Sequence, residues 1–583
     1  MPPPPSLLVP EIEAHRRAES VELPSASSDS ILSDMHKDDN TVEEGRVQTD
    51  ADQELLQRQY ELAQLDRSSQ RNWEMIKKLT VCGVAFLNDA YDMFAINIVA
   101  MILGFVYYND ATGSAQNTVP KKWDTLIKIA VQIGCLLGQL IMGRLGDKVG
   151  RTTVYSAGLM IAIITTIASA FSSSMVRGFN VFIVLFIWRV LLGFGIGSDY
   201  PLTATIVSEY ASVHNRGKLM AAVFSFQGFG NVLAPIVSII VLACFAQSID
   251  RDVQNLDYVW RIIIGVGCIP GVSTLYWRMT MTDSERFRHV NNGDISASDE
   301  SMTAGSEGEK LLAQQNLSST PSPVPEGPPA LPNNSASANS ASAIPDEAQL
   351  RRVKTFAQYF SEWRHLKVLL GTSIAWFSLD VAFYGINLNS SIVIGAIGFA
   401  GDIHADRPSR YITRNCLGNI IINILGSVPG YWISVFTIER LGRVRIQLLG
   451  FAVLTVLYLI LGFAYHQILD KSSGAFIFIF SLAQLFQNFG PNVTTFVIPG
   501  EVFPTRFRST AHGISAAMGK LGAIVAQGGF LQLKDIGGKD AWIDHLLQIF
   551  ALFMLIGFVV TFWIPESKGK TLEEICDERE EYY

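Results

Sequence analysis

The sequence predicts an all-α membrane protein in which twelve transmembrane helices form two pseudo-symmetric six-helix bundles. Three observations lead to this fold class. Of the 583 residues, 17% are charged and 49% are hydrophobic, whereas soluble globular proteins carry about 25% charged residues. Mostly apolar runs of at least about 18 residues recur along the chain, and each can cross a bilayer as a helix. Motifs of the first half return in the second half at a constant spacing.

The apolar runs define the order of the elements. They cover roughly 78–107, 125–145, 153–173, 179–211, 217–246, 258–279, 368–398, 413–437, 446–466, 474–503, 510–533 and 542–564. Polar, Ser- and Pro-rich stretches cannot bury a core and are predicted to be disordered. The resulting domains are an N-tail at 1–70, a bundle at 71–283, a linker at 284–360, a second bundle at 361–564 and a C-tail at 565–583.

Composition excludes several classes of function. The net charge of −8 comes mainly from acidic tails, so no nucleic-acid partner is expected. Six cysteines without a C-x-x-C pair predict neither a disulfide framework nor a metal site. Glycine-rich stretches lie only inside apolar runs, so we expect no nucleotide loop, no enzyme activity and no cofactor. The N-terminus does not have the pattern of a secretory signal.

Basic residues indicate the orientation. The short loops alone are nearly balanced, but Lys and Arg flank the first run, the linker and the last run. The positive-inside rule then places both tails and the linker in the cytosol. Four N-x-[ST] matches, at Asn316, Asn333, Asn389 and Asn492, are expected to be coincidental, because they fall in cytosolic segments or in apolar runs.

An internal repeat relates the two halves. DKVGR at 147 returns as ERLGR at 439, and the Glu209/Arg216 pair returns as Glu501/Arg508; both spacings are 292 residues (147 to 439, 209 to 501). DAYDMFAIN, from 89, faces DVAFYGIN, from 380, 291 residues later (89 to 380). Parallel repeats of this kind place a substrate site near the membrane midplane, between the halves.

Polar residues inside the apolar runs occupy related positions in the two halves. The pairs are Asp89 with Asp380, Tyr200 with Asn492, and Gln227 with Lys520. A charged side chain at the bilayer centre costs about 2.5–3.5 kcal/mol on insertion scales, so such residues indicate a functional site.

The stretch GIGSDYPLTATIVSEYA, 195–211, places Asp199 and Pro201 inside an apolar run. Pro201 has no N–H for the carbonyl of Gly197 and is expected to kink the helix there. Nearby glycines at 193, 195 and 197 would permit close helix contact or bending. We therefore expect a hinge at this point.

These motifs resemble one family. GSDYPLTATIVSEYA (197–211), WFSLDVAFYGINLN (376–389), NFGPNVTTFVIPGEVFPTRFRSTAHGISAAMGKLGAI (488–524) and FLNDAYDMFAIN (86–97) are similar to the proton-coupled phosphate transporters of fungi and plants. That family is a branch of the major facilitator superfamily. PESKGKTLEEI (565–575) resembles the broader sugar-porter tail. Ser198 and Thr203 replace the usual Gly and Ser of the family signature.

The resemblance implies residue roles. It implies a phosphate site formed by Tyr200, Gln227, Trp376, Asp380, Tyr384, Asn492 and Lys520, and proton-pathway carboxylates at Asp89, Asp92, Asp199 and Asp380. The spacing of 376, 380 and 384 independently places these three side chains on one helix face. A protonated Asp380 would donate to phosphate, and an ionised one would repel it, so proton and phosphate would favour each other's binding.

The loop charges indicate a cytoplasmic gate. They are Asp147, Arg151, Glu209, Arg216, Glu439, Arg443, Glu501 and Arg508. We expect Asp147 and Arg151, with Glu209 and Arg216, to form ion pairs that hold this end closed.

Simpler interpretations stay open for each group. Asp199 could pair with Arg189 or cap a helix, Lys520 could extend to an interface, and Asp89 and Asp380 could form structural pairs. Trp376 and Tyr384 could face the core or lipid, Gln227 and Asn492 could hold helices together, and the loop charges could be topology signals alone.

The predicted function is import of inorganic phosphate with protons across the plasma membrane by alternating access, and the cytosolic tails could bind kinases or ubiquitin ligases. The alternatives are an organophosphate porter of the glycerophosphoinositol type, a sugar porter, and a phosphate transceptor that signals. Three membrane-embedded Asp residues and a Lys suit a proton and an anion better than a neutral sugar.

Overall fold

In a computed structural model of the chain, the described residues are 73–109, 117–173, 180–284, 355–396, 398–404, 406–538 and 541–576. All of them belong to one unit, Leu65–Tyr583. The described residues form helices and loops, without a strand among them. The disorder predicted for 1–70 and for most of 284–360 concerns residues outside these ranges.

The helices of the first half run in chain order. They are α3 Trp73–Tyr107, α4 Lys121–Val149, α5 Arg151–Ala170, α6 Val181–Ile196, α7 Asp199–Tyr210, α8 Arg216–Arg251, the 3₁₀ helix η2 Val253–Asn255, α9 Leu256–Val266 and α10 Cys268–Met279.

The helices of the second half begin after the linker. They are α12 Phe356–Ser361, α13 Trp363–Asn387, α14 Ser390–Ala396, α15 Pro408–Ile422, the π-helical turn η4 Asn423–Ser427, α16 Val428–Leu441, α17 Arg443–Phe463, α18 Tyr465–Lys471, α19 Ser473–Asn488, α20 Pro491–Val502, α21 Arg508–Leu533, α22 Ile543–Thr561 and α23 Leu572–Ile575.

Eleven helical segments of the described residues are long and apolar enough to cross a membrane. The predicted spans therefore agree with the structure except for the tenth, 474–503. That run is divided into α19 and α20, of 16 and 12 residues. Helix α19 ends at Asn488, Gly490 has an extended backbone, and Pro491 opens α20, where a missing N–H costs nothing.

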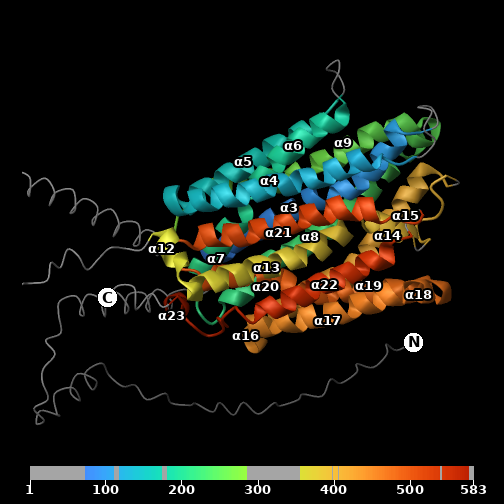
Figure 1. Ribbon diagram of the computed structural model, residues 1–583. Helices are drawn as coiled ribbons and strands as arrows, with labels where there is room; N and C mark the ends of the chain where they lie inside the picture. The colour runs from blue at the N-terminus through green and yellow to red at the C-terminus, as the bar shows by residue number, and fades with distance from the viewer. Residues whose placement is uncertain are drawn as a thin grey trace, which may run out of the picture. The chain divides into compact units, whose positions relative to one another are not determined.

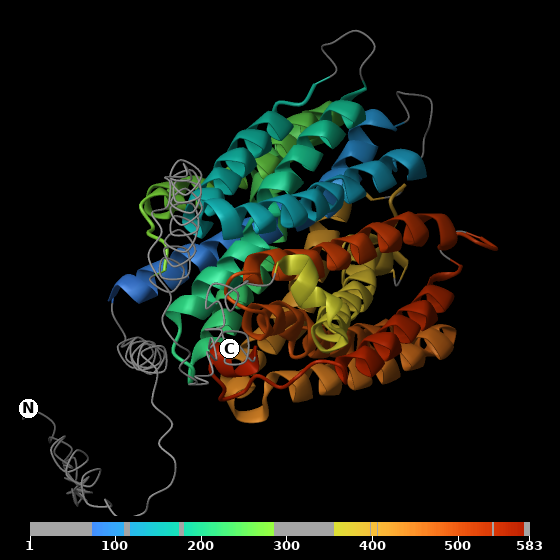
Figure 2. The same ribbon diagram turned by 60° about the vertical axis from the view of Figure 1, so that its left-hand side comes forward.

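The two halves lie against each other mainly along α4 and α8 of the first half and α15, α16 and α21 of the second. Helix α4 packs on α21, and α8 packs on α15 and α16, while the other helices pack mainly within their own half. Figure 2 shows the two groups, blue to green and yellow to red, and Figure 1 shows α4 beside α21 between them. Side chains of these helices therefore meet at the contact between the halves.

The helix boundaries repeat with the spacing found in the sequence. Helices α6 and α7 are separated at 196–199, and α19 and α20 are separated at 488–491, which lie 292 residues later (196 to 488, 199 to 491). The break that we expected near Asp199 is thus present, and its counterpart lies before Asn492. Each break gives a pair of half-helices whose ends meet inside the protein.

Glycines let α6 approach its neighbours closely, as expected for the run at 193–197. A Cβ at Gly193 would collide with the backbone of Val131 in α4, and one at Gly195 would press on the carbonyl of Gly158 in α5. The absence of a side chain therefore allows the helix backbones to touch, which is a common means of packing in membranes.

Candidate functional site

A buried cation and carboxylate lie at the contact between the halves. Lys520 Nζ, on α21, is 3.0 Å from Asp380 Oδ2 and 2.8 Å from Tyr384 Oη, both on α13. The side chains of Lys520 and Asp380 are 1% and 2% exposed. Lys520 is therefore fully embedded and paired, and the interpretation that it extends to an interface is wrong.

Aromatic rings from both halves enclose this ammonium group. Lys520 Nζ lies 4.9 Å from the ring centroid of Tyr200 and 4.4 Å from that of Tyr384. The Trp376 ring is 6.3 Å from Tyr200 and 5.5 Å from the His512 ring. Residues 376, 380 and 384 share one buried face of α13, as their spacing predicted. We call Tyr200, Trp376, Asp380, Tyr384 and Lys520 the lysine cluster.

The two predicted amides form a second polar group beside the lysine cluster. Tyr431 Oη donates to Gln227 Oε1 at 2.9 Å, and Asn492 Nδ2 donates to Tyr431 Oη at 2.7 Å. The Phe224 ring packs against both groups. Its centroid is 6.3 Å from the ring centroid of Tyr200 and 6.0 Å from that of Tyr431. The predicted site residues are thus brought together in two adjacent groups, and Tyr431, which the sequence analysis had not named, joins the two amides of the second group.

Asp89 and Asp92, two carboxylates on α3, differ in their hydrogen bonding. Asp89 is buried, and its Oδ2 has no hydrogen-bond partner among the described residues. Asp92 accepts from Asn88 at 3.2 Å and from Thr166 at 3.3 Å, both within its own half. Asp89 is therefore the carboxylate whose hydrogen-bonding capacity is left open, whereas Asp92 is built into the first bundle.

Asp199 forms an ion pair, but not with the expected partner. Its two carboxylate oxygens bind both Nη atoms of Arg278, one of them at 3.0 Å, and Ser198 Oγ donates to it at 3.0 Å. Arg189 instead donates to the backbone oxygen of Asp92. The Arg278 guanidinium also lies 3.2 Å from the Tyr155 ring centroid. The alternative of an Asp199–Arg189 pair is therefore wrong.

The loop charges lie together at one end of the helices. Glu209 pairs with Arg151 of its own half and with Arg508 of the other half, at 3.4 Å for the second pair. Of the expected ion pairs, Arg151 also lies 3.8 Å from Asp147, and the contact of Glu209 with Arg508 adds a pair across the halves that had not been expected. Arg443 pairs with Glu501 at 2.9 Å and with Glu439 at 2.6 Å. We call Asp147, Arg151, Glu209, Arg443, Glu439, Glu501 and Arg508 the gate network.

Hydrogen bonds to the backbone reinforce this closure. Asp147 accepts from the N–H and hydroxyl of Thr510, each at 2.7 Å, and Arg151 donates to the Thr505 carbonyl at 2.8 Å. Conversely, Glu439 accepts from the Lys218 N–H at 3.0 Å. Arg216 is buried at the start of α8. Each half thus holds the first turn of a helix from the other half.

The chain segments that follow α10 and α22 anchor the gate network in the same way. Asp283 accepts from the Thr152 N–H at 2.9 Å, and Glu566 accepts from the Arg443 N–H at 2.9 Å. The next residues, Ser284 and Ser567, donate to Glu209 and Glu501. The sequence analysis had noticed PESKG but not its counterpart TDS at 282–284.

The opposite end is also closed across the halves. Lys128 Nζ, on α4, is 3.0 Å from Asn389 Oδ1, and Asn97 Nδ2 is 2.6 Å from Ser390 Oγ. Asn389 in turn donates to Gln527, whose Nε2 donates to the Tyr384 carbonyl. Lys128 and Asn389 had not been predicted; a lysine within an apolar run was the available signal.

Buried polar groups between two repeated bundles, with breakable contacts at both ends, define a secondary transporter that exposes one site alternately to each side. Residues 79–330 and 340–578 match the sugar (and other) transporter family. The chain belongs to this family, in the branch of the fungal and plant inorganic phosphate transporters.

Curated relatives resemble nearly the whole chain. The chain is 39% identical over 521 residues to the inorganic phosphate transporter PHO84 of Saccharomyces cerevisiae, covering 86% of this chain and 84% of that protein. It is 36% identical to the repressible high-affinity phosphate permease of Neurospora crassa, over 89% of each chain. The putative inorganic phosphate transporter 1-13 of Oryza sativa is 37% identical, over 86% and 91%.

Solved structures support the fold. The major facilitator proton:xylose symporter XylE, bound to 6-bromo-6-deoxy-D-glucose, superposes with a TM-score of 0.60 at 18% identity, over 86% of this chain and 98% of that chain. The partially occluded inward-open form of XylE from E. coli gives a TM-score of 0.57. At this identity the likeness establishes the major facilitator fold alone.

Proposed function

We propose that the protein imports inorganic phosphate together with protons across the plasma membrane, by alternating access between the two bundles. The observation that carries the proposal is the buried Lys520–Asp380 pair at the contact between the halves. The relatives named as phosphate transporters and permeases support the choice of substrate. The gate network would face the cytosol, as the basic flanks of the first span, the linker and the last span indicate.

Charge balance explains how the pair would couple the two substrates. Without substrate, Lys520 and an ionised Asp380 are together neutral. A proton on Asp380 alone leaves the ammonium group unpaired, and a dihydrogen phosphate alone adds an unpaired negative charge. Proton and dihydrogen phosphate together restore neutrality, and an unpaired charge buried in the protein costs several kcal/mol. The half-loaded states are therefore disfavoured, and the empty and fully loaded states can change conformation.

The remaining residues have proposed roles around this pair. Tyr200, Trp376 and Tyr384 would donate to phosphate oxygens from the lysine cluster, and Gln227 and Asn492 would do so from the second polar group. Asp89, Asp92 and Asp199 are proposed proton-pathway carboxylates, and Asp89 is the one with an oxygen free to accept. Loosening the gate network would open the cytosolic side.

The tails and the linker carry a separate proposal, which rests on composition alone. Kinases or ubiquitin ligases would act on their Ser-rich and charged segments and so control trafficking or turnover. Deletion of 1–65 and 290–345 tests this. Unchanged uptake, trafficking and turnover would remove the proposal and leave the transport function as it is.

The first experiment is uptake of radiolabelled phosphate in a transporter-null yeast. Wild type, Asp380→Asn and a control Asp406→Asn are compared at acidic and neutral pH, with and without a protonophore. Asp406 is a matched control because it also pairs with a basic residue, Arg414 at 3.0 Å, but is partly exposed.

Phosphate uptake by wild type and by Asp406→Asn should rise at acidic pH and collapse when the protonophore is added. Asp380→Asn should show no phosphate uptake. Phosphate uptake that ignores the protonophore would refute proton coupling. Uptake of glycerophosphoinositol without phosphate would identify an organophosphate porter, and phosphate binding without uptake would identify a sensor.

A further inference from the structure

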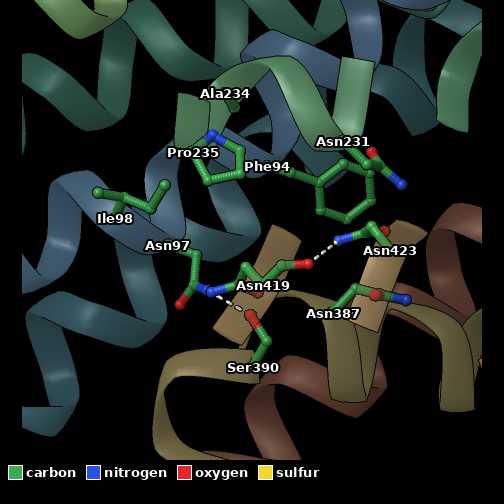
Figure 3. Close-up of a pocket in the computed structure, with 10 residues that line it drawn as sticks. All are labelled: Phe94, Asn97, Ile98, Asn231, Ala234, Pro235, Asn387, Ser390, Asn419 and Asn423. Atoms are coloured by element: carbon green, nitrogen blue, oxygen red, sulfur yellow. Dashed lines mark hydrogen bonds between the residues drawn. The ribbon is translucent and has the colours of Figure 1, made fainter. Parts of the chain in front are cut away.

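A cavity lies between the halves, beside the lysine cluster on the side away from the gate network. In this conformation about 20 Å³ is open to the centres of water molecules, room for one or two waters, so a larger ion would enter only when the halves move apart. Its lining residues come from both halves: Phe94, Asn97, Ile98, Asn231, Ala234, Pro235, Asn387, Ser390, Asn419 and Asn423. Figure 3 shows these side chains around it. We call it the asparagine cavity, because five of the ten are asparagines.

The cavity offers both hydrogen-bond donors and acceptors, and no charged side chain lines it. Asn423 Nδ2 donates to the Asn419 carbonyl at 2.8 Å, and Asn97 Nδ2 donates to Ser390 Oγ at 2.6 Å. Each amide nitrogen carries two hydrogens, so each of these keeps a second one to donate. Asn231 and Asn423 are each only 7% exposed, and the Oδ1 atom of each is buried without a hydrogen-bond partner among the described residues.

Three helices lose their regular backbone hydrogen bonding around this cavity. Pro235, inside α8, has no N–H to give to the carbonyl of Asn231, one turn earlier. Asn423 begins the π-helical turn η4, a feature that is frequent at functional sites. Helix α13 ends at Asn387, and α14 restarts at Ser390. At membrane depth, such irregular backbone is tolerated where it is buried in protein or lines a polar cavity.

The donor and acceptor pattern selects a class of ligand. Dihydrogen phosphate has hydroxyl groups that donate and oxygens that accept, so it can satisfy both the free amide oxygens and the free amide hydrogens. Sulfate has no hydroxyl group and would leave the buried amide oxygens unsatisfied. A site without a fixed charge also favours a monoanion over a dianion, because desolvation of the dianion costs more.

We propose that the asparagine cavity is a second phosphate subsite, which dihydrogen phosphate occupies before it reaches the lysine cluster. This inference rests on the proposed function. Asn387 lies three residues after Tyr384 of the lysine cluster on α13, and Asn231 lies four residues after Gln227 of the second polar group on α8. The cavity is therefore about 4.5–6 Å from these groups along the helices. In the proposed orientation the cavity is on the extracellular side, where arriving phosphate meets it first.

Uptake kinetics of the full chain test the subsite. Asn231→Ala and Asn423→Ala should each raise the phosphate KM about tenfold and leave Vmax near the wild-type value. Tenfold is the change in affinity that corresponds to the loss of about one hydrogen bond. Asn415→Ala is the matched control. Asn415 is fully buried on α15, donates to the Tyr411 carbonyl at 3.2 Å and does not line the cavity. Arsenate, which also bears hydroxyl groups, should lose inhibitory potency in parallel with phosphate.

Three outcomes are decisive. If wild type takes up phosphate but Asn231→Ala and Asn423→Ala match Asn415→Ala, the amides only hold helices together; the subsite fails and the proposed function stands. If wild type takes up no phosphate, the proposed function itself fails. A rise in KM confined to the two cavity variants supports the subsite.

Direct binding gives a second measurement that does not need transport. Radiolabelled phosphate is bound to the purified full chain in nanodiscs, in the background Lys520→Met. Weak residual binding should persist, should disappear on adding Asn423→Ala, and should survive Asn415→Ala. Absence of residual binding to folded Lys520→Met would overturn the subsite. Should Lys520→Met fail to fold, the kinetic comparison decides alone.

Discussion

Lys520 and Asp380 face each other between α21 and α13, with Nζ 3.0 Å from Oδ2 and both side chains buried. Replacing one partner leaves the other as an unpaired buried charge, which typically costs about 3–5 kcal/mol. Lys520→Met and Asp380→Leu should therefore each lower the thermal unfolding temperature in detergent. The double variant should regain most of the loss, yet remain inactive in uptake. Additive losses in the double variant would show that the two charges do not interact.

The gate network predicts that Arg508 holds the cytosolic side closed. Arg508→Ala should favour the inward-open form, because it removes the guanidinium that reaches Glu209 from the other half. Ala204, on α7 between Tyr200 and Glu209, packs near Gly500 of α20 and serves as a Cys reporter. Its labelling by an impermeant thiol reagent in inside-out vesicles should rise about tenfold or more, since 1.4 kcal/mol already changes a population tenfold.

The control for that experiment is Arg414→Ala. Its pair with Asp406 is partly exposed, so its loss should leave labelling of the Ala204→Cys reporter unchanged. Equal labelling in the two arginine variants would contradict the assignment of Arg508 to the gate network.

Two glycines of the repeated loop motif should resist substitution. Gly150 and Gly442 have φ of 121° and 97°, a region that side chains strain, and each sits against a carboxylate, of Asp283 or Glu566. Gly150→Ala and Gly442→Ala should each destabilise the fold by about 1–3 kcal/mol. Gly528 lies within α21, where a Cβ would meet no other atom within 4 Å. Gly528→Ala should therefore leave the unfolding temperature unchanged or slightly raised. Tolerance of alanine at 150 and 442 would refute the strain argument.

If Asp89 carries a second proton, phosphate uptake should respond to the membrane potential. One proton on Asp380 with one dihydrogen phosphate is electroneutral, so a second proton carried by Asp89 would make uptake electrogenic. An inside-negative potassium diffusion potential should stimulate uptake into proteoliposomes by wild type and by the exposed control Asp250→Asn. Asp89→Asn should keep the response to a pH gradient and lose the response to potential. Stimulation that survives in Asp89→Asn would assign the extra charge elsewhere.

The repeat made much of the fold predictable. The Pro201 motif predicted the helix break at 196–199, and the spacing of 292 residues relates it to the break at 488–491, which the single predicted span 474–503 had missed. The face of α13 that carries Trp376, Asp380 and Tyr384 followed from helical periodicity alone. Helical periodicity is a local property, so the local sequence is enough to predict it.

The pairings were harder to predict, because they depend on which helices meet. Glu209 was expected to pair within its own half, and it does bind Arg151, but it also binds Arg508 of the other half, which no local motif indicated. Arg278 resembled an orientation signal, although it ends a helix whose fold places it on Asp199. Tyr431 joins two predicted amides and stands in no motif that separates it from an ordinary interfacial tyrosine.

The hydrogen bond from Ser284 to Glu209 has a mechanical consequence. Ser284 is the last described residue before the linker, so the chain enters the linker from a residue that is bound to Glu209. Glu209 is the carboxylate that Arg151 and Arg508 share. The start of the linker is therefore attached directly to the gate network, so a structural change there would reach these ion pairs without passing through the membrane-spanning helices.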